Sequence, residues 1–215
     1  MVSAAAEVST GIASWKELLK KCRALVFDFD GTLVDSVPIK RKAFDHCFEE
    51  FPAKKREIQS YCHGNNHTPR WEKFKFVYEQ ILRLPYTKEI EQKLLQRFER
   101  ETTEQIARAP ALPGAEEFLG AVRSRYRTAL LSSTPHAILL QILKKRGWSG
   151  QFDEVQGAPV DKGVWLKSLE RRGFSAKQIL FLGDTPEDAA AAQEANCHFI
   201  SVPELGDFRR LLGTL

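Results

Sequence analysis

Continuous apolar runs alternate with amphipathic segments over much of the chain. The apolar runs predict buried strands, because a parallel strand covered on both faces is apolar along its whole length. The predicted strands lie at residues 23–28, 128–131, 152–155, 178–182 and 198–202. The amphipathic segments between the later strands predict helices at residues 115–125, 161–172 and 185–195. A further helix is predicted after Pro135 and ends at residue 146. Strands that alternate with helices predict an α/β fold with a Rossmann-like, doubly wound parallel sheet.

The section between the first and second strands has a purely helical pattern. Residues 38–51, 69–84 and 87–107 carry apolar side chains at helical spacing, which predicts amphipathic helices. Residues 52–68 are polar and irregular, and we expect a loop there. This section therefore predicts an all-helical insertion into the α/β fold.

These patterns predict a core domain that a helical domain interrupts. We place the core at residues 23–36 and 110–215 and the helical domain, or cap, at residues 37–109. Residues 1–22 are expected to form an N-terminal extension. We expect its small, polar start to be disordered in part, because ordering such residues costs entropy that few contacts offset.

The composition is that of a globular protein. The 215 residues are 43% hydrophobic and 28% charged, and this length accommodates one core domain and a modest insertion. Apolar runs fall short of the roughly 18 residues of a membrane helix, and the N-terminus lacks the basic start and apolar run of a secretory signal. We therefore expect a cytoplasmic protein without a membrane partner.

The net charge of +4 suits an anionic substrate, but the basic clusters are short. We therefore expect no nucleic-acid partner. The four cysteines form no C-x-x-C pair. This spacing argues against a disulfide framework or a zinc site, and reduced thiols agree with a cytoplasmic location.

Polar side chains follow three of the predicted strands at the point where each strand ends. They are Asp28 and Asp30, Ser132 and Ser133, and Asp184. Ligands of such sheets bind at the carboxyl ends of the strands. A turn at Gly31 would let both Asp28 and Asp30 face one site. One carboxylate could then act as a nucleophile and the other as a general acid/base, and the crowded carboxylates would favour Mg²⁺ as cofactor.

The segment Asp28-Phe29-Asp30-Gly31-Thr32 resembles the first motif of the haloacid dehalogenase-like hydrolase superfamily. Three further segments resemble its other motifs in the same order. They are Ala129-Leu130-Leu131-Ser132, Gly157-Ala158-Pro159-Val160-Asp161-Lys162 and Phe181-Leu182-Gly183-Asp184-Thr185-Pro186-Glu187-Asp188. A helical insertion after the first motif is similar to the C1 cap of this superfamily. The resemblance implies a C1-capped phosphatase, in a group with phosphoglycolate phosphatase-like and β-phosphoglucomutase-like members.

The resemblance also implies a role for each matched residue. Asp28 would be the nucleophile and a metal ligand, and Asp30 the general acid/base with its carbonyl oxygen as a second ligand. Asp184 would bind Mg²⁺ directly. Asp188, one helical turn further, would lie behind the ligands, although the family also allows it nearer the metal. The implied phosphate-binding residues are Thr32, Ser132, Ser133 and Lys162, and Lys162 would also be catalytic.

The third motif departs from a common pattern of the family. Many members have proline directly after the lysine, whereas Lys162 here follows Pro159 by three residues and opens a predicted helix. Lys167, a full turn deeper in that helix, is the alternative.

Three residues of the cap are candidate substrate contacts. Arg70 and Lys73 belong to an R-x-x-K-F segment that resembles one in the caps of some phosphatases of the superfamily, although a solvated helix face explains them equally well. His63 and His67 have metal-ligand spacing, but the Gly-Asn-Asn between them favours a loop. We expect His63 near the mouth of an active site.

The leading functional hypothesis is Mg²⁺-dependent hydrolysis of a small phosphate monoester through an aspartyl-phosphate. A phosphosugar phosphomutase is the enzyme alternative, although the stretch 38–41 lacks the cap histidine of such mutases. Asp30 argues against a dehalogenase. A non-catalytic binding protein on the same fold is the alternative of another class. We expect a small phosphorylated metabolite as the binding partner and a monomer in solution.

Overall fold

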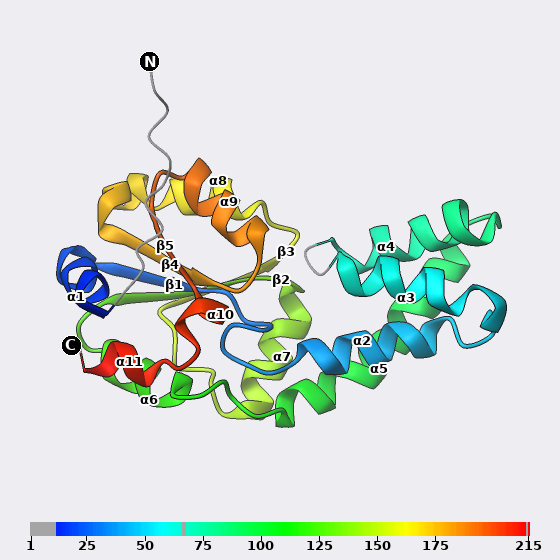
Figure 1. Ribbon diagram of the computed structural model, residues 1–215, viewed down its shortest axis with the longest axis horizontal. Coiled ribbons are helices and arrows are strands. Elements are labelled where there is room, and N and C mark those ends of the chain that lie inside the picture. Colours follow the sequence, from blue (N-terminus) through cyan, green and yellow to red (C-terminus); the bar gives the residue numbers. More distant parts are fainter. Residues whose placement is uncertain (1–11, 66–67, 214) are drawn as a thin grey trace, which may run out of the picture. The chain divides into compact units, whose positions relative to one another are not determined.

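The computed structural model describes residues 12–65, 68–213 and 215 (Figure 1). The candidate His67 and the start of the expected N-terminal extension lie outside the described residues. The chain divides into two compact units: Met1–Asp35 with Pro110–Leu215, and Ser36–Ala109. We call the first the core unit and the second the helical unit.

The core unit is built on one five-stranded sheet whose paired strands all run parallel, in the order β3-β2-β1-β4-β5. Its strands are β1 (Ala24–Phe27), β2 (Arg127–Pro135), β3 (Glu154–Ala158), β4 (Ile179–Gly183) and β5 (His198–Ser201). Phe27 pairs with Leu130 on one side and with Leu182 on the other. This register brings the last residue of β1 level with Leu130 of β2 and with Leu182 near the end of β4. The predicted α/β fold with a doubly wound parallel sheet is confirmed.

Helices cover both faces of the sheet (Figure 1). Side chains alternate along β1, so Val26 packs with Trp165 and Phe181 in one core cluster, while Phe27 contacts Phe118 on the other face. The helical segments of this unit are α1 (Ile12–Lys21), α6 (Ala115–Val122), α7 (His136–Arg146), α8 (Lys162–Ser168), η3 (Glu170–Arg172), η4 (Ala176–Gln178), α9 (Pro186–Glu194), α10 (Val202–Leu205) and α11 (Arg209–Leu212).

Several elements of the core unit differ from the sequence prediction. Strand β3 spans residues 154–158 rather than 152–155, and the short helices α10 and α11 were not predicted. Strand β2 continues to Pro135, where we expected an end at residue 131, because Pro135 still pairs with Ala158 after an irregularity that follows Leu131. Helix α1 was not predicted. It buries Trp15, Leu18 and Leu19, which are spaced as one face of a helix.

The helical unit packs around an aromatic core. The ring of Phe44 lies 4.6 Å from that of Phe98 and 5.6 Å from that of Phe74, measured between centroids. Its elements are α2 (Val37–Cys47), η1 (Pro52–Lys54), α3 (Lys55–Gly64), α4 (Arg70–Phe76), the π-helical η2 (Val77–Leu82) and α5 (Lys88–Arg108).

The prediction that residues 52–68 form a loop was wrong. Most of this segment forms η1 and α3, and Ile58 and Cys62 are buried in the core of the helical unit. These two residues are four apart and therefore share one face of the helix. The helix escaped prediction because its other positions are mostly polar and face solvent.

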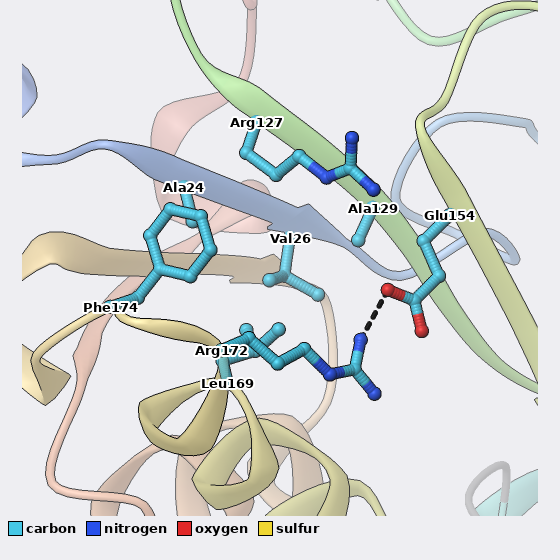
Figure 2. Close-up of a pocket in the computed structure, with 8 residues that line it drawn as sticks. All are labelled: Ala24, Val26, Arg127, Ala129, Glu154, Leu169, Arg172 and Phe174. Atoms are coloured by element: carbon cyan, nitrogen blue, oxygen red, sulfur yellow. Dashed lines mark hydrogen bonds and ion pairs between the residues drawn. The ribbon is translucent and has the colours of Figure 1, made fainter.

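A cavity of about 210 Å³ opens on the α8 side of the sheet (Figure 2). Ala24, Arg127 and Glu154 open their strands and line the cavity together with Arg172, which bonds Glu154. The cavity therefore lies near the amino ends of the strands. The polar side chains predicted to do chemistry follow the opposite, carboxyl ends.

Two further predictions concern the whole chain. Over the described ranges, none of the helices combines the length and apolar character needed to cross a membrane. The four cysteines are buried and free, as expected from their spacing.

Candidate active site

Asp28 directly follows the central strand of the sheet. Its backbone N–H donates to the carbonyl oxygen of Leu182 at 2.9 Å, which continues the pairing of β1 with β4 for one more residue. The side chain is buried, with 5% of the residue exposed. The sheet itself therefore fixes the position of this carboxylate.

The chain turns immediately after Asp28. Gly31 has a φ of 83°, which an L-residue with a side chain rarely adopts, and its N–H donates to the carbonyl oxygen of Val34 at 2.9 Å. Within this turn Thr32 is fully buried, and its hydroxyl donates to Oδ1 of Asp184 at 3.1 Å. Thr32 thus holds a carboxylate that follows the neighbouring strand β4.

Lys162 connects two of the carboxylates. Its Nζ lies 2.6 Å from Oδ1 of Asp28 and 2.6 Å from Oδ1 of Asp188. Lys162 is the first residue of α8, and the Asp161 side chain caps that helix by accepting from the N–H of Val164. The alternative, Lys167, pairs with Glu194 at the surface. The structure therefore brings Lys162 to Asp28 and leaves Lys167 outside the cluster.

Asp188 is held from two sides. Its Oδ2 accepts hydrogen bonds from the backbone N–H and the hydroxyl of Thr185, at 3.1 and 2.8 Å, in a reciprocal cap of α9. A Cβ at Gly183 would lie 2.5 Å from the Cβ of Asp188. The glycine before Asp184 is thus required for the close packing of Asp188 against the end of β4.

The site accumulates negative charge in a buried place. Burial raises the pKa of Asp28, and the nearby carboxylates raise it further, while Lys162 acts in the opposite direction. Burial and Asp188 raise the pKa of Asp184 to about 6. Burial lowers the pKa of Lys162, but attraction to Asp28 and Asp188 outweighs that effect, so its pKa is raised. Lys162 is therefore charged at neutral pH.

The carboxylates fit a divalent cation. Asp28, Asp184 and Asp188 each offer an oxygen atom, and these atoms lie within 4.8 Å of one another. Oxygen donors of this kind suit Mg²⁺. Burial and the repulsion of Asp188 together raise the pKa of Asp184, and a bound cation would offset both effects.

The end of β2 carries the remaining polar groups. Ser132 is buried and its Oγ accepts from the backbone N–H of Thr134 at 3.1 Å. Ser133 is exposed. The hydroxyl of Thr134 donates to Oδ2 of Asp30 at 2.8 Å. Thr134 was not among the site residues predicted from the sequence, although its place two residues after Ser132 on the same strand end could have indicated it.

The three candidates in the helical unit have partners within that unit. Nε2 of His63 lies 2.9 Å from Oδ1 of Asp45, and His63 belongs to the last turn of α3. The prediction of a loop around it was therefore wrong. Lys73 is buried and its Nζ donates to the carbonyl oxygen of Cys62 at 2.9 Å. The guanidinium of Arg70 lies over the ring of Phe98 at 4.7 Å. Their role as substrate contacts stays a prediction.

Known proteins share this fold and sequence pattern. A sequence profile of the haloacid dehalogenase-like hydrolases matches residues 22–196. The chain belongs to this family. It is 26% identical to phosphoglycolate phosphatase from Aliivibrio fischeri, over 84% of each chain. It is also 24% identical to hexitol phosphatase A from Escherichia coli, over 89% of this chain and 88% of the relative.

A solved structure shows the same fold. The haloacid dehalogenase-like family protein SP0104 from Streptococcus pneumoniae has a TM-score of 0.65 and 22% identity, and the match covers 91% of each chain. The family assignment confirms the resemblance of the four motifs and the prediction that the chain is a hydrolase. The named relatives are phosphatases.

Proposed function

We propose that this hydrolase is a Mg²⁺-dependent phosphatase that cleaves a small phosphate monoester through an aspartyl-phosphate on Asp28. The observation that carries the proposal is the buried carboxylate of Asp28 at the end of the central strand, bonded to Lys162 at 2.6 Å. A nucleophile held by the backbone of a sheet and flanked by a fixed cation suits attack on an anionic phosphoryl group.

The proposed reaction has two steps. In the first, an oxygen of Asp28 attacks phosphorus while Asp30 gives its proton to the leaving oxygen of the substrate. In the second, Asp30 takes a proton from water, and the water oxygen attacks the phosphorus of the aspartyl-phosphate, which frees Asp28 and phosphate. Lys162 stabilises the negative charge on the phosphoryl oxygens, with Ser132 and Ser133 as further phosphate contacts.

Asp28, the carbonyl oxygen of Asp30 and Asp184 would hold Mg²⁺. When bound, the ion would neutralise negative charge on the phosphoryl group. We assign a different role to Asp188, since its two carboxylate oxygens already accept hydrogen bonds from Lys162 and Thr185. Asp188 would hold Lys162 in place. Thr32 would position Asp184, to which its hydroxyl donates, in addition to its predicted phosphate contact.

The names of the curated relatives guide the choice of substrate. Phosphoglycolate and hexitol phosphates are small phosphate esters of aliphatic alcohols. We propose a substrate of this class, a small phosphorylated metabolite handled by a monomeric cytoplasmic enzyme. The leaving group of such an ester is a strongly basic alkoxide, so the reaction needs the proton that Asp30 provides.

Phosphate release from 2-phosphoglycolate, glycerol 3-phosphate, sorbitol 6-phosphate and p-nitrophenyl phosphate tests the proposal. We expect turnover with Mg²⁺, loss of turnover with EDTA, and a loss of at least about 1,000-fold in Asp28→Asn. Asp153→Asn is the matched control, because Asp153 lies in the same unit but bonds Thr128 at the start of β2. Full activity in EDTA or in Asp28→Asn would contradict the mechanism. Isomerisation of a sugar phosphate without phosphate release would favour a mutase.

A further inference from the structure

The end of strand β2 is irregular, and this irregularity aims a threonine at the proposed acid/base. The regular pairing of β2 with β3 is interrupted between Leu131 and Pro135. Thr134 lies in this stretch and is 2% exposed. Its hydroxyl donates to Oδ2 of Asp30 at 2.8 Å, and its backbone N–H donates to Oγ of Ser132 at 3.1 Å.

Strand β3 holds this segment from the side. A Cβ at Gly157 would lie 2.6 Å from the carbonyl oxygen of Thr134 and 2.6 Å from the Cα of His136. Without a side chain there, β3 packs directly against the backbone around Thr134. The N–H of Gly157 also donates to Nδ1 of His136 at 3.1 Å. The backbone that carries the threonine hydroxyl is therefore packed directly against β3.

We propose that Thr134 is a positioning residue for general acid catalysis. This inference rests on the proposed function, in which Asp30 is the general acid. Its hydroxyl fixes Oδ2 of Asp30 and so makes Oδ1 the oxygen that carries the transferable proton. Oδ2 is a hydrogen-bond acceptor both while the proton is on Oδ1 and in the carboxylate, so the Thr134 hydroxyl donates to it before and after the proton leaves. Thr134 touches neither the phosphoryl group nor the leaving group in this role.

The balanced step is as follows. The bond between phosphorus and the leaving oxygen breaks as the bond between Asp28 and phosphorus forms. The proton on Oδ1 of Asp30 moves to the leaving oxygen, and an alcohol departs. Asp30 becomes a carboxylate whose Oδ2 accepts from the Thr134 hydroxyl, and a bond from a neutral donor to a charged group is among the stronger hydrogen bonds.

The leaving group distinguishes positioning from a merely structural role. An alkoxide needs the proton, whereas p-nitrophenolate is a weak base and departs without one. The quantity to measure is kcat/KM in the presence of Mg²⁺, because it reports the steps up to departure of the leaving group and excludes hydrolysis of the aspartyl-phosphate. The alkyl substrate is whichever of 2-phosphoglycolate, glycerol 3-phosphate and sorbitol 6-phosphate the wild type uses best.

Three variants carry the test. Thr134→Val removes the hydroxyl and keeps the shape, and we expect kcat/KM to fall about 10- to 100-fold for the alkyl ester but less than about 3-fold for p-nitrophenyl phosphate. Thr134→Ser keeps the hydroxyl and should stay within about 3-fold of wild type on both substrates. Thr128→Val is the matched control, since Thr128 is buried on the same strand and its hydroxyl donates to Asp153 at 3.2 Å. It should leave both values unchanged.

Two results would overturn the inference. One is an equal loss on both substrates in Thr134→Val, and the other is a selective loss that Thr134→Ser shares. If Thr134→Val does not fold, as judged by circular dichroism, Thr134→Ala removes the same hydroxyl and must show the same selectivity. These outcomes leave the proposed function standing, because wild-type turnover and its loss in Asp28→Asn are measured separately. Failure of those two measurements would overturn the proposed function itself.

Discussion

Each unit of the molecule largely encloses one lysine, and the two lysines have opposite surroundings. In the core unit, Lys162 lies between the carboxylates of Asp28 and Asp188, and their attraction raises its pKa against the effect of burial. In the helical unit, Lys73 lies 4.6 Å from the ring centroid of Phe44 and donates to a carbonyl oxygen. Burial lowers the pKa of Lys73 to about 8.

The difference separates two uses of a buried charge. Lys162 partly neutralises carboxylates that repel one another, so its removal would leave buried negative charge uncompensated. Lys73 is itself the charge that burial destabilises. A lysine such as Lys162 supports a site that can hold anions and cations together. A lysine such as Lys73 lowers the stability of its own unit at neutral pH.

The largest expected effect is that of Lys162→Met. We expect a loss of kcat/KM of at least about 100-fold and a decrease of about 3 kcal/mol in the free energy of unfolding without Mg²⁺, because Asp28 and Asp188 lose their cation. Urea denaturation and phosphatase assays measure both. Lys167→Met is the matched control on the same helix, and it should change neither quantity, since its partner Glu194 is at the surface. Equal effects of the two substitutions would contradict the claim that Lys162 compensates buried negative charge.

Lys73→Met tests the other half of the comparison. Between pH 8 and the pKa of an exposed lysine, about 10.4, the unfolded chain binds more protons than the folded one. The free energy of unfolding of the wild type therefore rises with pH over that window. Below pH 8 the ammonium is charged in both states and its burial destabilises fully, while above about pH 10.4 it is neutral in both and this destabilisation is absent.

We accordingly expect Lys73→Met to be more stable than the wild type by about 1 to 2 kcal/mol at pH 7, a gain reduced by the lost hydrogen bond to Cys62. The gain should vanish at about pH 10.5. Urea denaturation of both proteins at each pH measures the difference in the free energy of unfolding. The contributions of other titrating groups, which both proteins share, cancel in this difference. If Lys73→Met is less stable than the wild type at pH 7, and the difference in the free energy of unfolding does not become smaller at high pH, Lys73 stabilises its unit.

The smallest expected effects concern two helix caps. The hydroxyl of Thr185 caps α9 and bonds Asp188, and the hydroxyl of Thr87 caps α5 by accepting from Ile90 at 3.3 Å. Replacement of either by alanine should lower the free energy of unfolding by about 1 kcal/mol. Thr185→Ala should also lower kcat/KM several-fold because it loosens the support of Lys162, whereas Thr87→Ala should not. Equal activity of the two variants would remove Thr185 from the account.

The sequence predicts those parts of the fold whose residues are apolar without interruption. Strands β1 and β4 are continuous apolar runs buried along their whole length, so their ends, and with them Asp28 and Asp184, could be located. Lys162 was located through the resemblance of the third motif, with Lys167 as the alternative, and the structure shows that it opens α8 directly after the capping residue Asp161. The family resemblance added roles that spacing alone leaves open.

Other features depend on contacts that a linear pattern does not contain. Helix α3 buries Ile58 and Cys62 against side chains from other helices, and such a sparse apolar face resembles a polar loop. Strand β2 extends through Ser132 and Thr134 because β3 pairs beyond an irregularity. The bond from Thr134 to Asp30 joins residues 104 apart in the sequence. The sequence can place Thr134 on the same strand face as Ser132 but does not show which group its hydroxyl contacts.

The most direct test of the central claim is to locate the phosphoryl group on the protein. Asp30→Asn should still transfer phosphate from p-nitrophenyl phosphate, whose leaving group needs no proton, but should hydrolyse the product slowly because water activation is lost. Acid quenching after mixing with Mg²⁺ and substrate, followed by proteolysis and mass spectrometry, should find one phosphorylated peptide, modified at Asp28. Release of p-nitrophenolate without a phosphorylated peptide, or with phosphate on another residue, would contradict the account.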